Sequence, residues 1–178
     1  MADEHESLEP FAEWIAEQPM FFVATAPSGD GGHVNLSPKG LEGLRVLGPR
    51  SLAYLDLTGS GAETIAHVRE NGRICVLLCA FTGAPRILRI QGTGTVHRPG
   101  EEAFEDLRAG FGDIAGVRSV ITVDADRIAT SCGYGVPLMT YEGDRRTLPA
   151  WAEKKGPEGL ATYWRERNAE SIDGLPAV

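Results

Sequence analysis

The 178-residue sequence predicts a mainly β fold, a small antiparallel β-barrel with peripheral helices. The middle of the chain holds about six short apolar segments, spaced roughly 8–14 residues apart and separated by turn residues. Only one helical pattern interrupts these segments, whereas a parallel sheet needs helices between most of its strands. Apolar residues make up 42% and charged residues 24% of the chain, which is typical of a globular protein.

A short helix is expected first. Ser7 is a candidate N-cap, Phe11, Trp14 and Ile15 follow at helical spacing, and Pro19 ends the helix. Six strands are then expected at residues 20–26, 33–37, 44–47, 52–56, 73–81 and 86–97.

One helix is predicted among the strands, over residues 62–71, with Gly72 just after its end. Residues 117–123 are rich in β-forming side chains, and a helix with Pro157 at its first position begins in the tail. No internal repeat or linker divides the chain. We therefore predict a single domain over residues 1–178, with a core from about 11 to 132 and a helical C-terminal extension from about 147 to 178.

Charge and composition exclude several functions. The formal net charge is −8, whereas a general nucleic-acid binder needs the opposite sign. The chain has no apolar run of the roughly 18 residues that a membrane span needs and no secretory signal pattern, so we expect a cytoplasmic protein. Three cysteines without a CxxC pair and four scattered histidines do not predict a disulfide framework or a zinc site.

Three segments carry polar residues that a plain barrel does not require. In residues 33–40 (HVNLSPKG) the polar side chains alternate with apolar ones and Lys39 follows them. Residues 57–64 (LTGSGAET) combine glycines and hydroxyls at a helix start, where backbone N–H groups accommodate anions. Residues 86–94 (RILRIQGTG) place Arg89 and Gln91 inside a strand. Taken singly, the segments are equally consistent with a solvated strand face, an ordinary helix cap and a strand exposed on one side.

The order of these segments resembles that of the pyridoxamine 5′-phosphate oxidase-like family of FMN-binding split β-barrels. The resemblance covers roughly residues 11–97. A second block, formed by SCGYGVP (residues 131–137), WAEKKGPEGL (residues 151–160) and SIDGLP (residues 171–176), is similar to an oxidase-related branch of that family.

The resemblance implies that FMN lies in a groove at the interface of a homodimer. The isoalloxazine is then expected beside Asn35, Leu36, Ser37 and Pro38, and the phosphate near Lys39, Thr58, Ser60, Gly61 and Thr64. Arg89 and Gln91 are expected to add contacts from a neighbouring strand, and Tyr134 to approach the flavin from the other subunit. Because side chains fill the interior of a small barrel, a large cofactor has to lie outside it, which also favours a homodimer.

Two departures from the family pattern argue against pyridoxamine phosphate as the substrate. Pyridoxamine phosphate oxidases carry Ser-Arg-Lys in the phosphate loop, whereas this chain has Gly-Ala-Glu-Thr, so Glu63 stands where a cation is expected. They also end in an Arg-Leu-x-Pro-type segment, and this chain ends in IDGLPAV.

The favoured function is therefore an FMN-dependent oxidoreductase that acts on an unidentified small organic substrate. The flavin would perform the redox chemistry, so no strong acid or base is required of the protein. The alternatives are a non-catalytic barrel that binds flavin, deazaflavin or haem, and a deazaflavin-dependent reductase. Cys132 is more often structural than redox-active in such a sequence context.

Overall fold

The computed structural model describes residues 3–178. Its strands form one antiparallel sheet in the order β3-β2-β6-β7-β8-β5-β4, and β1 pairs with β8 beside this path. The strands are β1 (Asp3–His5), β2 (Phe21–Thr25), β3 (Asn35–Lys39), β4 (Leu44–Gly48), β5 (Ser51–Leu57), β6 (Arg73–Cys79), β7 (Ile87–His97) and β8 (Val117–Ser131). The helices are η1 (Glu9–Phe11), α1 (Ala12–Glu17), α2 (Glu63–Asn71), α3 (Glu102–Arg108) and α4 (Thr147–Arg167).

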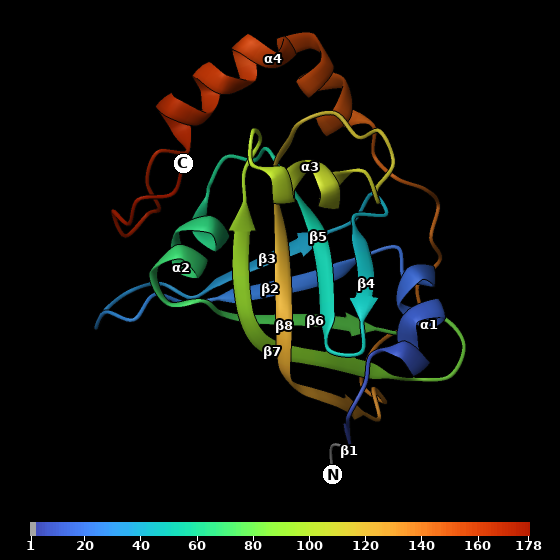
Figure 1. The fold of residues 1–178 in the computed structure, drawn as a ribbon. Helices are drawn as coiled ribbons and strands as arrows, with labels where there is room; N and C mark the ends of the chain where they lie inside the picture. The colour runs from blue at the N-terminus through green and yellow to red at the C-terminus, as the bar shows by residue number, and fades with distance from the viewer. Residues whose placement is uncertain (1–2) are drawn as a thin grey trace.

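The two long central strands, β7 and β8, let the sheet fold over itself. Figure 1 shows β4 and β5 crossing in front of β2, β3 and β6, while β7 curves from one layer into the other. The register of β7 on β8 shifts between Gln91 and Gly92. A Cβ atom at Gly92 would collide with the main-chain carbonyl of Asp124, so only glycine allows this close approach at the bend.

The core lies between the two layers. In β2, β6 and β7 its buried members alternate with more exposed residues, whereas β5 and the first half of β8 are buried on both faces. The fully buried members include Val23, Leu52, Tyr54, Val76, Leu88, Ile90 and Ile121. A second cluster around Phe104 and Phe111 packs α3 against β5 and β8.

The predicted fold class is confirmed, with eight strands rather than six. The strand β1 (Asp3–His5) has no apolar residue, so hydrophobic alternation cannot reveal it. The last strand extends to Ser131, well past the β-rich stretch seen in the sequence. The sequence pattern does not show the second half of this strand, because it carries charged residues on an exposed face.

The C-terminal helix α4 arches over one end of the sheet (Figure 1). It consists of two helical segments separated at Gly156, whose φ is 67° and ψ is 171°. Pro157 follows this break, as the sequence predicts for a helix start, and the segment before the break is an additional helix. No helix among residues 3–178 has the length and hydropathy needed to cross a membrane.

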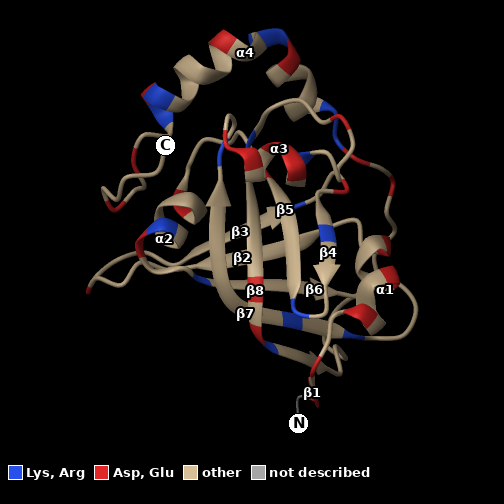
Figure 2. Cartoon of the chain, viewed as in Figure 1, with Lys and Arg blue, Asp and Glu red and all other residues tan. Residues whose placement is uncertain are grey.

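Charged residues are concentrated on the helices and loops, and the strands are largely uncharged (Figure 2). Lys39, Asp56 and Arg118 are exceptions, because they come from strands and are largely shielded from solvent. Charged groups in such an environment need partners. They lie at the end of the sheet where β5 leads into α2.

Candidate functional site

The loop that joins β5 to α2, residues 58–62, is fixed at its start by hydrogen bonds to distant segments. Thr58 is fully buried, and both its backbone N–H and its hydroxyl donate to the carbonyl of Gly116, each at 2.8 Å. The indole N–H of Trp164 in α4 donates to the Thr58 hydroxyl at 2.8 Å. The three residues that follow, Gly59, Ser60 and Gly61, are exposed.

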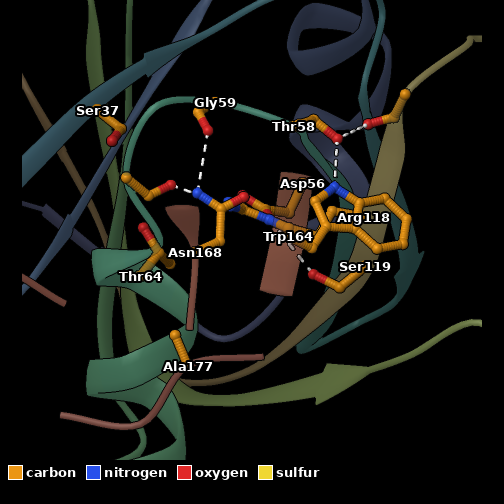
Figure 3. A network of polar contacts seen from close by, with 12 residues as sticks. Ser37, Asp56, Thr58, Gly59, Thr64, Arg118, Ser119, Trp164, Asn168 and Ala177 are labelled. Carbon is orange, nitrogen blue, oxygen red and sulfur yellow. Dashed lines mark hydrogen bonds and ion pairs between the residues drawn. The ribbon is translucent and has the colours of Figure 1, made fainter. Parts of the chain in front are cut away.

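A buried charge cluster lies beneath this loop (Figure 3). The Lys39 ammonium is 3.1 Å from one Asp56 carboxylate oxygen, and the Arg118 guanidinium contacts the other at 3.0 and 2.9 Å. Burial alone would raise the pKa of the Asp56 carboxyl, but Lys39 and Arg118 outweigh it and hold the pKa below its usual value. One carboxylate therefore faces two cations, which leaves a surplus positive charge.

A second polar network joins β2, β3 and α2. The Asn35 amide donates to the hydroxyls of Thr25 and Thr64, at 3.1 and 3.0 Å, and its oxygen accepts from Ser37 at 3.2 Å. The Thr25 hydroxyl also lies 3.0 Å from Nδ1 of the fully buried His67. The predicted residues Asn35, Ser37 and Thr64 are thus brought together at the start of α2.

The segment after α4 covers this end of the sheet. Asn168 is fully buried, and its side-chain amide donates to the carbonyls of Gly59 at 3.1 Å and Ser60 at 3.5 Å. Both Glu63 carboxylate oxygens accept from the Ile172 N–H, at 3.2 and 3.1 Å. Further along, Ala177 packs in a small apolar cluster with residues of α2.

The other predicted residues lie elsewhere. Register places Leu36 and Pro38 of β3 on the sheet face opposite the core, in rows that lead across β2 and β6 to Gln91 and Arg89. Arg89 donates to the Ser131 hydroxyl at 3.1 Å, and the Gln91 side-chain oxygen accepts from Arg127 at 3.0 Å. This outer face is opposite to the face of β3 that carries Asn35, Ser37 and Lys39, and β3 is the edge strand between the two faces. The β5–α2 loop together with Lys39, Asp56, Arg118, Trp164 and Asn168 is called the loop cluster below.

Tyr134 lies in a turn shortly after β8 and is 82% exposed. No side-chain hydrogen bond joins it to another residue in the described part of the chain. Cys132, in the same segment, is exposed. Within one chain, Tyr134 does not meet the loop cluster.

A cavity of about 580 Å³ lies on a different side, between the end of α1 and the segment around residues 139–144. Its lining includes Trp14, Arg86 and Tyr141 but none of the predicted cofactor-binding residues. The charged and hydrogen-bonding groups converge at the loop and not at this cavity, so the loop cluster is the better candidate site.

Four residues of the loop cluster were missed by the sequence analysis: Asp56, Arg118, Trp164 and Asn168. The first two had a usable signal, since each is a charged residue inside an apolar strand pattern, SLAYLDL and VRSVITV. Trp164 and Asn168 had no such signal in the sequence. They reach the loop only because the C-terminal segment folds back over it.

Known proteins resemble this chain in sequence and in fold. The family model for pyridoxamine 5′-phosphate oxidase matches residues 8–132. A pyridoxamine 5′-phosphate oxidase family protein of Aspergillus flavus, ustO, is 40% identical over an alignment 192 positions long, which covers 98% of this chain and 77% of that protein.

Two solved structures share the fold at low sequence identity. HupZ of Group A Streptococcus has a TM-score of 0.53 and 21% identity, covering 67% of this chain and 90% of that one. An FMN-binding protein of Syntrophomonas wolfei subsp. wolfei has a TM-score of 0.50 and 13% identity, covering 73% of this chain and 84% of that one. The family-model match and the fungal relative together cover nearly the whole chain, and the protein therefore belongs to the pyridoxamine 5′-phosphate oxidase family.

Proposed function

We propose that the protein binds FMN and acts as a flavin-dependent oxidoreductase on a small organic substrate. The observation that carries the proposal is the convergence of Lys39, Gly61 and Thr64 on one loop. Lys39 and Arg118 both contact Asp56, Arg118 also donates to the Gly61 carbonyl, and Thr64 is the second residue of α2. Membership of the pyridoxamine 5′-phosphate oxidase family and the fold shared with an FMN-binding protein support it.

The residues present suit the phosphate end of FMN. Lys39 and Arg118 supply two cations beneath the loop, and exposed glycines let a phosphate approach the main chain. Ser60 adds a hydroxyl at the loop tip. A bound flavin would supply the hydride or electron transfer, and the chain's own groups would bind and orient it.

The flavin ring is proposed to lie against the outer face of the sheet in a groove completed by a second copy of the chain. On β3 and just before it, Leu36 is 65% and Val34 76% exposed, which is unusual for apolar side chains on a strand. Arg89 lies in the same face, and Ser131 is its one side-chain hydrogen-bond partner among the described residues. A homodimer would cover these apolar groups and close the groove.

Titration with FMN tests the cofactor assignment. We expect saturable quenching of flavin fluorescence and a flavin absorbance band that stays with the protein through gel filtration, at the elution volume of a dimer. Arg89→Ala should weaken FMN binding about tenfold, because one charge-assisted hydrogen bond is lost. Arg165→Ala, on the exposed side of α4, is the matched control and should leave the affinity unchanged.

The outcomes separate the candidate functions. A protein that never retains FMN would contradict the proposal, and so would a flavin-loaded monomer for its dimeric part. Flavin that is bound but neither reduced nor reoxidised faster than free flavin would assign a binding role. Preferential binding of a deazaflavin or haem in competition with FMN would assign that molecule, instead of FMN, as the cofactor.

A further inference from the structure

Three successive carbonyl groups of the β5–α2 loop are held by side chains from other parts of the chain. Asn168 Nδ2 donates to the carbonyls of Gly59 and Ser60, and Arg118 Nη1 donates to the carbonyl of Gly61 at 3.0 Å. Figure 3 shows the Asn168 amide directed at this stretch of the loop. The donors come from two separate elements, since Asn168 follows α4 and Arg118 belongs to β8.

The planar trans peptide then fixes the orientation of the N–H groups. In a trans peptide the N–H of each residue points opposite to the carbonyl of the residue before it, and the described chain contains no cis bond. With those three carbonyls turned toward Asn168 and Arg118, the N–H groups of Ser60, Gly61 and Ala62 point away from these two side chains. None of them has a hydrogen-bond acceptor among residues 3–178.

The Asn168 side chain itself is only half satisfied. Its Oδ1 atom is buried and has no hydrogen-bond partner in the described part of the chain. A buried acceptor without a partner costs stability, and the arrangement offsets this cost only through the two loop carbonyls that the Asn168 amide holds. Asn168 also lies beyond residues 8–132, the part matched by the family model.

We infer that Asn168 and Arg118 are positioning residues that hold the loop N–H groups of Ser60, Gly61 and Ala62 as a cradle for an anionic phosphate. The inference rests on the proposed function and extends it, because it makes the C-terminal extension part of the cofactor site. Arg118 brings the surplus positive charge of the Lys39–Asp56–Arg118 cluster to the same loop.

Glu63 works against the cradle. Its carboxylate lies close to Gly61, since a Cβ atom built on Gly61 would be 3.3 Å from Glu63 Oε1. The same carboxylate holds the Ile172 N–H and so fastens the tail. Replacing the charge while keeping an acceptor should therefore strengthen phosphate binding and leave the tail in place.

The first test uses inorganic phosphate, which needs no flavin. In amide NMR spectra of the full chain, phosphate should shift the resonances of Ser60, Gly61 and Ala62 in a saturable way. Glu63→Gln should raise the phosphate affinity severalfold, and Asn168→Ala should lower it about tenfold. Glu166→Gln removes a charge from an exposed position of α4 and should change nothing.

The second test compares FMN with riboflavin, which lacks the phosphate. Asn168→Ala should lower FMN affinity about tenfold and riboflavin affinity less than twofold, whereas general damage to the site lowers both alike. If Asn168→Ala does not fold, Glu63→Gln still tests the cradle, and an unchanged phosphate affinity in that variant would overturn it.

The remaining outcomes each support or overturn the cradle. Absence of phosphate-dependent shifts at residues 60–62 overturns the cradle, and an unchanged affinity in Asn168→Ala overturns the positioning role. If phosphate binds in the expected way but neither flavin does, the cradle stands and the proposed function fails.

Discussion

Asp56 is the residue on which the charges of the candidate site depend. Its side chain is 1% exposed and accepts from Lys39 of β3 and from the neighbouring β8 residues Arg118 and Ser119. Because the two cations hold its pKa below the usual value, the carboxylate stabilises the fold above the unfolded-state pKa. That contribution is lost as the pH falls through the lowered native pKa.

Asp56→Asn should destabilise the protein by about 3–5 kcal/mol, because it leaves two shielded cations without a carboxylate. Urea unfolding followed by circular dichroism measures the change. Asp126→Asn, which removes a carboxylate from an exposed position of β8, should shift the unfolding free energy by less than about 0.5 kcal/mol. Equal effects in the two variants would show that the cluster contributes no special stability.

The sequence predicts some residues of the candidate site but not the contacts that join them. Lys39 and the hydroxyl-rich loop were identified from their local patterns, and the structure links them. Their connection through Asp56 and Arg118 could not be predicted, because it depends on the pairing of β5 with β8 across more than 60 residues of chain. Whether these residues bind the cofactor stays a prediction.

The element with the most consequence for the site is the C-terminal segment after α4. It is tied down at several points. Besides Asn168 and Ile172, Asp173 accepts from the backbone N–H of His33 at 2.8 Å and lies 2.7 Å from the ring Nδ1. The Ala177 carbonyl accepts from Arg69 and Arg98, each at 2.7 Å. The sequence predicted a helical extension to about residue 178, but α4 ends at Arg167 and the segment after it is not helical. Its docking could not be predicted, because it is made by single side chains without periodicity.

Docking of this segment should depend on pH. The hydrogen bond and charge of Asp173 raise the pKa of His33 above 6.5, and the hydrogen bonds from His33 lower the pKa of Asp173 below 3.8. The His33 contribution is complete below 6.5 and is lost as the pH rises through its raised native pKa. The Asp173 contribution is present above 3.8 and is lost as the pH falls through its lowered native pKa.

Amide hydrogen exchange of residues 171–177, corrected for the intrinsic exchange rate at each pH, measures this docking. Protection should be greatest between the two titrations and decline on the alkaline side. In His33→Gln, which cannot become charged, the alkaline decline should disappear. If wild type and variant show the same profile, His33 does not control the docking of the tail.

The shape of the whole molecule depends on the bend that carries the sheet from one layer to the other. Antiparallel order and the mainly β class follow from the spacing of strands and turns in the sequence. The bend does not, because a glycine inside a strand pattern is equally compatible with a flat strand. Only the closeness of Gly92 to the Asp124 carbonyl shows that glycine is required there.

Gly92→Ala should lower the unfolding free energy by about 2 kcal/mol or more, since the added methyl group forces the two longest strands apart. Thermal and urea unfolding measure the loss. Gly112→Ala is the control, because a Cβ atom there meets nothing within 4 Å, and it should be nearly neutral. Comparable losses would mean that the bend tolerates a side chain.

The sheet does not close, so β3 and β4 each keep one edge without a strand partner among the described residues. An open edge offers main-chain donors and acceptors to any extended chain nearby and invites self-association into aggregates. Pro38 interrupts the donors along β3, and the β4 strand is only five residues long with an irregular register near Val46. These features hinder edge-to-edge pairing with other chains, so Pro38 opposes aggregation whether or not a cofactor lies beside it.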